Sequence, residues 1–368
     1  MFVLDSHCDT PSQIIRLRDL SLDNSHAHVD FPKLKRGGVD GAFFAIYIPA
    51  SLDQEEAADY ADLLLNSLDE TLEANSDRAA YAYNPSQAYA NKAKGLFSVF
   101  LGLENGSPVG KSLDRLQYYY DKGIRYMTLC HSADNEICDS CASEVKRWGG
   151  LSPFGREVVK EMNRLGMLID VSHVSDDTFY DVIRHSSRPV VATHSCCRAL
   201  ASHPRNMTDE MITALAAAGG VIQINFYPFF LDDTFSKVYD ASGLAAKSHI
   251  ETEFIKDPSD PLKRQAWNEV QDELQALPRP SYRRIVDHID HVVGLVGIDH
   301  VGLGSDFDGI EVTPEGMEDI SGFHLIFDEL RRRGYSDEDM EKIAGGNFFR
   351  VLSQVLPGAL PGACLMLD

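Results

Sequence analysis

Histidines follow two short apolar segments near the middle of the chain. His173 comes after MLIDVS and His194 after PVVAT. Both runs are rich in β-branched residues, too short for a helix and bounded by turn residues, which is typical of strands buried on both faces. The stretch between them, 176–184, opens with acidic residues and continues with apolar residues at helical spacing. We therefore predict a strand, a helix and a parallel strand, with a histidine at the carboxyl end of each strand.

Other predicted strands also end in residues that could do chemistry, and parallel α/β folds carry their reactive groups at that end. These residues are His7 and Asp9 on the first strand, Glu104 on the third, His131 on the fourth, and Asp306 with Asp308 on the eighth. Side chains alternate along a strand. We therefore expect His7 and Asp9 to point the same way, and likewise Asp306 and Asp308.

Imidazoles and carboxylates converging from different strands are the ligands of Zn²⁺ or a similar divalent ion. The candidate metal ligands are His7, Asp9, Glu104, His173 and His194. One open catalytic ion does not need so many, so we predict two ions that share a carboxylate. A single histidine near a strand end is more often a hydrogen-bonded core residue, but this pattern recurs at six strand ends. The pair His26 and His28 precedes the second strand, and we expect it at the opposite rim, exposed or packed.

The order of the elements predicts the fold. Eight strands are expected at 2–9, 41–48, 96–104, 125–131, 167–173, 189–194, 221–227 and 300–307. Helices are expected at 55–72, 112–121, 154–165, 209–218 and 282–293, with a last one at 337–349. This alternation favours one (β/α)8 barrel of the TIM type spanning residues 1–368. An open doubly wound sheet is the alternative, weakened by the absence of a glycine-rich nucleotide motif.

One long insertion interrupts the alternation after the seventh strand. Residues 228–280 are polar and contain a predicted helix at 261–277. Insertions at this end of a barrel often form a lid or one wall of the pocket. A surface elaboration or a subunit contact fits equally well, which leaves a homodimer open.

Composition narrows the partners and the compartment. The formal charge of −22 argues against nucleic acid or an anionic membrane as a partner. No apolar run is long enough to span a membrane. Seven cysteines, an odd number, fit a reducing cytosol better than a disulfide scaffold. Cys138 and Cys141 form a lone CxxC, which is weak support for a redox or metal role.

Several segments together resemble the renal, or membrane, dipeptidase family. They are DSHCDTP, HVDFPKLKRGGVDGAFFAIY, GLENG, GIRYMTLCHS, LIDVSHVS, ATHS followed by RNMTD, INFY and GLGSDFDG, from residue 5 to residue 309. Each motif is weak alone, but their order and spacing are specific. The first strand carries H-x-D where most amidohydrolases carry H-x-H, which is itself a mark of this family.

The resemblance implies a barrel of the amidohydrolase type with two Zn²⁺ ions, one held by His7 and Asp9 and the other by His173 and His194, with Glu104 bridging. It implies a dipeptide substrate, attacked at its peptide carbonyl by a hydroxide that bridges the ions. Further roles follow by likeness: His131 contacts the substrate, Arg205 binds its terminal carboxylate, Asp306 is the acid/base and Tyr227 lines the pocket. Taken alone, Arg205 would be interpreted as a surface charge.

The sequence departs from the pattern of the eukaryotic family members in features that bear on its cellular compartment. Eukaryotic members carry a secretion signal and a lipid-anchor tail. We find no signal at the start, and the segment 357–368 is too short for an anchor. Ala133 stands where the vertebrate pattern has a cysteine. We therefore expect a cytoplasmic enzyme of the bacterial type.

Two other functions remain as alternatives. Another binuclear-metal amide, ester or lactam hydrolase would use the same barrel. A non-catalytic binding protein would be expected to have lost ligands, and none of the five is missing.

Overall fold

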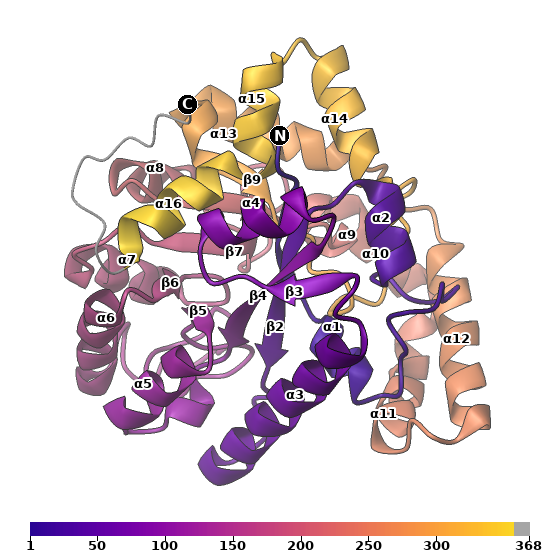
Figure 1. The fold of residues 1–368 in the computed structure, drawn as a ribbon, viewed down its shortest axis with the longest axis horizontal. Coiled ribbons are helices and arrows are strands. Elements are labelled where there is room, and N and C mark those ends of the chain that lie inside the picture. Colours follow the sequence, from indigo (N-terminus) through magenta and orange to yellow (C-terminus); the bar gives the residue numbers. More distant parts are fainter. Residues whose placement is uncertain (357–368) are drawn as a thin grey trace.

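The computed structural model describes residues 1–356 and shows a parallel β-barrel surrounded by helices (Figure 1). The barrel strands, in order, are β1 Leu4–Cys8, β2 Gly41–Tyr47, β4 Phe97–Glu104, β5 Ile124–Thr128, β6 Leu168–Asp170, β7 Val191–Ser195, β8 Val221–Ile224 and β9 Val301–Leu303.

The two ends of this sheet meet. Cys8 pairs with Phe307 in parallel register, and the amide of Asp9 donates to the carbonyl of Phe307 at 2.8 Å. The amide of Asp306 donates to the carbonyl of His7 at 3.0 Å. The predicted (β/α)8 barrel is therefore confirmed, and the open sheet is excluded. A short strand that we did not predict, β3 Ala79–Tyr81, pairs with β4 outside the barrel path, and its three residues give no hydrophobic pattern.

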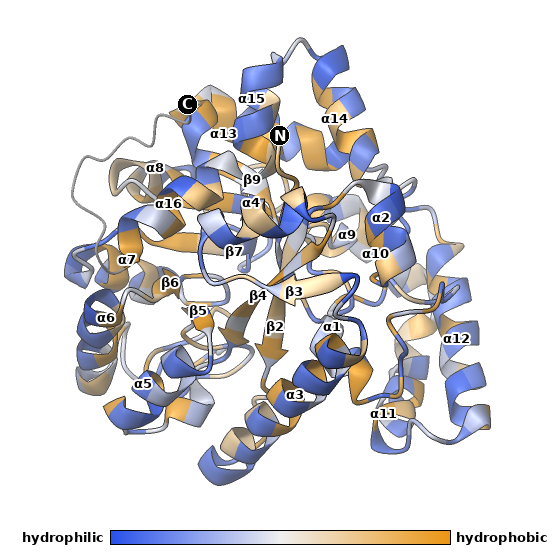
Figure 2. Cartoon of the chain, viewed as in Figure 1, coloured by the Kyte–Doolittle hydropathy of each residue, from blue (hydrophilic) through white to orange (hydrophobic). Residues whose placement is uncertain are grey.

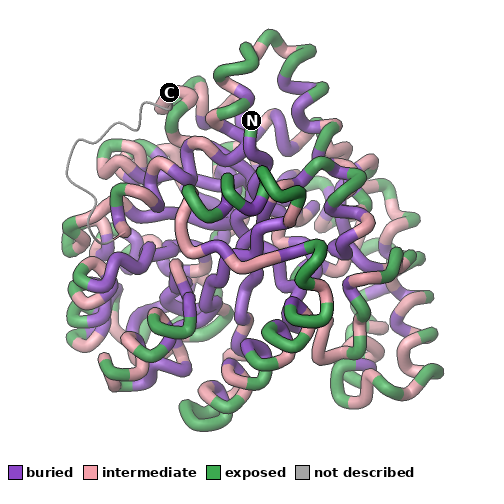
Figure 3. The backbone as a smooth tube through the Cα atoms, in the orientation of Figure 1, coloured by how far each residue is buried: buried purple, intermediate pink, exposed green. Residues whose placement is uncertain are grey.

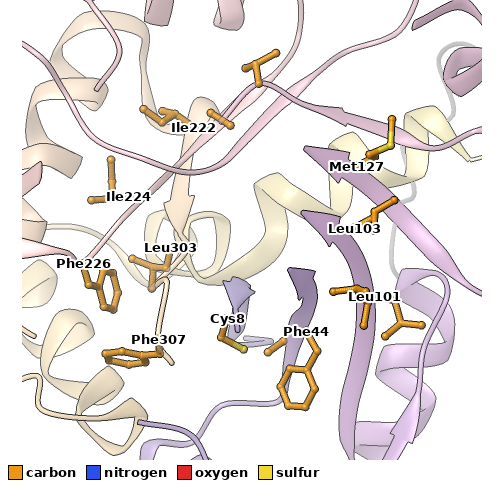
Figure 4. Close-up of a cluster of buried hydrophobic side chains, with 14 of the residues drawn as sticks. Cys8, Phe44, Leu101, Leu103, Met127, Ile222, Ile224, Phe226, Leu303 and Phe307 are labelled. Atoms are coloured by element: carbon orange, nitrogen blue, oxygen red, sulfur yellow. The ribbon is translucent and has the colours of Figure 1, made fainter. Parts of the chain in front are cut away.

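Alternating side chains build two cores, and the barrel strands that carry them are largely buried (Figure 3). Phe43, Phe100, Tyr126 and Leu168 point into the barrel with neighbours from β1, β7 and β8. Their neighbours along the strands, including Phe44, Leu101, Leu103 and Met127, pack outward against the helices (Figure 4). Because apolar residues fill the amino end of the barrel, the polar side chains of its interior collect at the carboxyl end.

Helices follow most strands on the outside of the barrel, and in Figure 2 they alternate hydrophilic and hydrophobic residues. The main ones are α3 Gln54–Ala74, α5 Leu113–Asp121, α6 Pro153–Leu165, α7 Asp176–His185, α8 Asp209–Ala217, α13 Arg283–Val296 and α14 Phe323–Arg332. Shorter helices are α1 Thr10–Ile14, α2 Phe31–Gly37 and α4 Pro85–Ala93. Ser152, Ser175 and Thr208 cap α6, α7 and α8 by accepting backbone N–H groups. The helices α3, α5, α6, α7, α8 and α13 agree with the predicted ranges to within a few residues, whereas α1, α2, α4 and α14 were not predicted.

The last predicted helix, 337–349, is wrong as a single element. The structure has α15 Asp337–Glu341, a π-helical turn Lys342–Gly346 and α16 Asn347–Val355. The break lies at Gly345, where a Cβ would come within 3.0 Å of the Leu4 side chain and the Phe2 carbonyl. The chain needs glycine there to pass close to β1.

The insertion is more helical than predicted. It contains α9 Pro228–Leu231, α10 Asp233–Ser242, a 3₁₀ turn Leu244–Lys247, α11 Ser248–Lys256 and α12 Pro261–Gln275. A small core that includes Phe254 and Trp267 joins these helices to Val312, in the connection after β9. The insertion therefore packs beside the carboxyl rim of the barrel, at the right of Figure 1.

None of the helices formed by residues 1–356 combines the length and the apolar character needed to cross a lipid bilayer. The segment 357–368, which we discussed as a tail, lies outside the described residues.

Candidate active site

The predicted site residues gather at the carboxyl rim of the barrel. His7, Glu104 and His194 lie within β1, β4 and β7. The others follow a strand end: Asp9, His131, His173 and Asp306. Strands β6 and β9 end at Asp170 and Leu303, earlier than predicted.

Residues with a left-handed backbone follow the ends of β6 and β9. His173 has φ 67° and Asp306 has φ 63°, values that an extended strand cannot contain. Such conformations are costly for residues other than glycine and concentrate at functional sites. In both connections the turn places a side chain in the metal cluster, the group of potential metal ligands formed by His7, Asp9, Glu104, His173, His194 and Asp306.

Asp306 and Asp308 do not share a face, contrary to our expectation. Asp308 also has a left-handed backbone, with φ 67°. Asp306 Oδ1 lies 3.9 Å from His7 Nε2. Asp308 instead accepts hydrogen bonds from Arg18 and from Thr10 Oγ1. The turn, rather than strand alternation, separates the two carboxylates.

The expected position of His26 and His28 at the opposite rim is also wrong. Residues 10–30 form the connection after β1, so they begin at the carboxyl rim. His28 is buried, and its Nδ1 accepts the backbone N–H of Asp308 at 2.9 Å. His26 is half-buried and lies 3.2 Å from Asp272 of α12. Neither histidine is part of the metal cluster.

Glu104 lies at the centre of the cluster, with its two oxygens facing different ligands. Oε2 lies 3.5 Å from His7 Nε2, which is itself 3.4 Å from Asp9 Oδ2. Oε1 lies 3.1 Å from His173 Nε2 and 3.4 Å from His194 Nε2. The chain therefore presents two ligand groups that share one carboxylate, an arrangement suited to a pair of divalent ions.

The unsatisfied atoms of the cluster fit metal ions. His7 Nε2 and Asp9 Oδ1 are buried and have no hydrogen-bond partner within residues 1–356. Burial opposes protonation of His7, but Glu104 and Asp9 raise the pKa of its imidazole well above the usual value. Burial, followed by the charge of Glu104, raises the pKa of Asp9 to about 6. A bound cation would offset the surplus of negative charge at Asp9 and Glu104. Burial lowers the pKa values of His173 and His194, which favours the neutral form that binds metal.

Hydrogen bonds hold two of the ligand imidazoles from behind. His7 Nδ1 lies 2.7 Å from the hydroxyl of Tyr126, and His194 Nδ1 lies 2.8 Å from Thr193 Oγ1. Both contacts leave the Nε2 atoms facing the cluster. Tyr126 and Thr193 were not predicted as site residues. In the sequence each is only a polar group inside a predicted buried strand.

Arg205 is buried rather than a surface charge. Its guanidinium donates to Ser195 Oγ and to the carbonyl of His194, both at 2.7 Å, and its Nε has no partner among residues 1–356. His131 packs its ring against His173, with ring centroids 4.1 Å apart. Burial and then Arg205 lower the pKa of His131 to about 4, so its imidazole is neutral at pH 7. A neutral imidazole and a guanidinium donor thus lie beside the His173 and His194 ligands.

Asp306 lies at the His7 side of the cluster. Its Oδ2 accepts a hydrogen bond of 2.8 Å from Asn225, another residue that the sequence analysis missed. Burial raises the pKa of Asp306 to about 7, with a smaller contribution from Asp9. A Cβ at Gly309 would lie 2.1 Å from Asp9 Oδ2 and 2.8 Å from Asp306 Oδ1. Only glycine therefore allows the backbone to approach the two carboxylates this closely.

Two further predicted positions lie at the edge of the site. The hydroxyl of Tyr227 donates to Glu311 at 2.6 Å, at the start of the insertion. Cys141 donates its amide to the carbonyl of His173 at 2.8 Å, and Cys138 is buried in the same connection. Neither cysteine belongs to the metal-ligand groups formed by residues 1–356.

The sequence of this chain is similar to those of proteins named as dipeptidases. The family model for membrane dipeptidase, peptidase family M19, matches residues 1–358. The dipeptidase verJ of Clonostachys rogersoniana is 32% identical over 340 residues, which cover 89% of this chain and 76% of that protein. The dipeptidase tcpJ of Claviceps purpurea (strain 20.1) is 30% identical over 366 residues, which cover 95% of this chain and 76% of that protein.

A solved structure extends the likeness to three dimensions. The probable dipeptidase PvdM from Pseudomonas aeruginosa superposes with a TM-score of 0.80 at 27% identity, covering 96% of this chain and 95% of that one. The family match spans the whole barrel and includes every predicted metal ligand. The chain belongs to the membrane dipeptidase family, peptidase family M19.

Proposed function

We propose that this chain, a metal-dependent hydrolase of the M19 family, cleaves free dipeptides with the help of two Zn²⁺ ions. The observation that carries the proposal is the position of Glu104 between two ligand groups. His7 and Asp9 face one of its oxygens, and His173 and His194 face the other. When bound, the ions would lower the pKa of water and polarise the peptide carbonyl.

Arg205 gives the site its expected preference for a free carboxyl terminus. Its guanidinium is held on two sides by Ser195 and the His194 carbonyl, and its Nε finds no partner in the described part of the chain. A planar guanidinium is well suited to a carboxylate. Because Arg205 lies beside the metal ligand His194, a bound terminal carboxylate would leave room for only a short peptide between Arg205 and the cluster.

His131 and Asp306 complete the proposed machinery on two sides of the cluster. His131 is neutral and lies against His173, so it can donate a hydrogen bond to the oxygen on which charge develops. Asp306 is held by Asn225 at the His7 side, where it can accept a proton and return it to the leaving amine. We also propose a cytoplasmic location, since the six cysteines among residues 1–356 are free thiols.

The carboxylate role of Arg205 gives the first test. We expect metal-loaded enzyme to cleave a free dipeptide but neither the amidated dipeptide nor a tripeptide. Arg205→Ala should lower kcat/KM on the free dipeptide by about thirtyfold or more, because removing one partner of a buried charge pair costs roughly 2–5 kcal/mol. The measurement is steady-state kinetics on matched free and amidated substrates.

Arg184→Ala is the matched control, because Arg184 is exposed and pairs only with Asp181 of its own helix. It should leave kcat/KM within about twofold of wild type. Equal cleavage of free and amidated dipeptides, or an unchanged rate in Arg205→Ala, would remove Arg205 from carboxylate binding. Failure to cleave any dipeptide would remove the proposed function itself.

A further inference from the structure

Asp170 is a fully buried carboxylate just behind the metal cluster, at the end of β6. Its Oδ2 accepts hydrogen bonds from Thr128 Oγ1 of β5 at 2.6 Å and from Thr193 Oγ1 of β7 at 2.7 Å. Its Oδ1 accepts the backbone N–H groups of Ser172 at 3.0 Å and Thr193 at 2.9 Å. One carboxylate therefore links three neighbouring strands directly below the His173 and His194 ligands.

The direction of these bonds determines the protonation of His194. A carboxylate only accepts, so the hydroxyl proton of Thr193 must point to Asp170. The lone pairs of Thr193 Oγ1 are then left for His194 Nδ1, 2.8 Å away, which must donate. In a neutral imidazole the other nitrogen then carries no proton. His194 Nε2 therefore presents a bare lone pair toward Glu104.

The other ligand imidazoles lack this support. His7 is held by the phenol of Tyr126 on a different strand. The His173 ring makes its polar contacts within residues 1–356 through Nε2, at 2.9 Å to His194 Nε2 and 3.1 Å to Glu104 Oε1. Of these two ligands, His194 is therefore the one held through its Nδ1, by Thr193 and Asp170.

We propose that Asp170, acting through Thr193, is a positioning residue for the metal position formed by His173 and His194. It sets both the tautomer and the ring orientation of His194. The inference rests on the proposed two-metal function, and it adds that the two metal positions have separate supports. Loss of the Asp170–Thr193 contact should lower the affinity for the ion at His173 and His194. The affinity for the ion at His7 and Asp9 should not change.

Thr193→Val tests this with little change in shape, because valine replaces the hydroxyl by a methyl group. We expect the affinity for one of two Zn²⁺ ions to fall by about 10–100-fold, the range for removal of an outer hydrogen-bond partner. The other ion should keep its wild-type affinity. Thr193→Ser restores the hydroxyl and should restore binding of both ions. Competition with a chelating dye measures the two affinities, independently of activity.

Thr128→Val is the matched control. It removes the other hydroxyl that bonds to the same Asp170 oxygen, and Thr128 is equally buried but does not contact His194. We expect both valine variants to lower the melting temperature of the metal-free protein by similar amounts. Only Thr193→Val should lose metal affinity.

Three results would overturn the inference. Thr193→Val could bind both ions as tightly as wild type, Thr128→Val could weaken metal binding as much as Thr193→Val, or Thr193→Ser could fail to restore it. If wild-type protein itself binds fewer than two ions, the two-metal proposal fails, and the inference fails with it. The two failures are distinguished by the wild-type titration alone.

Discussion

Asp306 and Asp308 are two residues apart, yet they serve different parts of the molecule. Asp306 faces His7 and is held by Asn225. Asp308 is bound by Arg18, Thr10 and the backbone amide of His28. The first therefore lies in the proposed metal cluster, while the second fixes the connection after β1 against the connection after β9.

Replacing each aspartate by asparagine should separate these roles. Asp306→Asn keeps the shape but cannot titrate, so we expect kcat to fall roughly 10²–10⁴-fold, the range for a positioned acid or base. Asp308→Asn should cost far less in kcat. It should instead lower the free energy of unfolding by on the order of 3 kcal/mol, because Arg18 loses its buried partner.

Kinetics and urea unfolding of both variants, each with and without added zinc, provide the measurement. Recovery of Asp306→Asn by excess zinc would mean that Asp306 only orients a ligand. A larger loss of kcat in Asp308→Asn would also contradict the assignment.

The ligand types could be predicted from sequence, but the residues behind them could not. His7, Glu104 and His194 are recognisable because each ends an apolar run. Asp170 and Thr193 lie inside such runs, where a polar residue is visible but its partner on another strand is not. The register that brings Thr128, Asp170 and Thr193 together is set by barrel closure, which no local pattern specifies.

Connections between elements determine where the reactive side chains finally lie. Strand alternation predicts the correct rim for Asp306 and His173 but not their direction, since both residues adopt a left-handed backbone beyond the strand. The position of His28 was predicted wrongly for a similar reason. Because His28 precedes the second strand, we expected it at the opposite rim, whereas the long connection after β1 folds back over the carboxyl rim.

His288 of α13 links three elements and gives a pH prediction. Its Nε2 donates to the carbonyl of Leu231 at 3.0 Å, and its Nδ1 accepts the amide of Cys197 at 3.1 Å. Burial lowers the pKa of His288 from 6.5 to about 4. The unfolded chain therefore binds more protons than the folded chain between these values. The contribution of His288 to stability is complete above pH 6.5 and is lost as the pH falls toward 4.

We expect this loss to be on the order of 3 kcal/mol. His288→Gln should be less stable than wild type at pH 7, and the difference between the two proteins should shrink as the pH falls. Urea unfolding from pH 7.5 to pH 4 measures both curves. His185→Gln is the control, since His185 is exposed at the end of α7 and should follow the wild-type curve. A constant difference between His288→Gln and wild type would contradict the prediction.

At the scale of the whole molecule, the barrel and its eight strands were predicted because the strands are buried on both faces and most of them therefore form or follow a short apolar run. The insertion was located at 228–280, and the helix predicted at 261–277 corresponds to α12, but the other helices and their contact with Val312 were not predicted. Most of its helices are short and polar on most sides, so their packing against one another depends on one small shared core. The single helix expected at 337–349 failed at Gly345, where the neighbouring β1 imposes the break.

We propose that one barrel mouth holds two metal ions through a shared Glu104. Elemental analysis of purified protein, combined with dipeptide hydrolysis before and after chelation, tests it most directly. We predict close to two divalent ions per chain, loss of hydrolysis on chelation and recovery when Zn²⁺ is restored. Protein that holds one ion or none, and that hydrolyses dipeptides equally well in the presence of chelator, would contradict the claim.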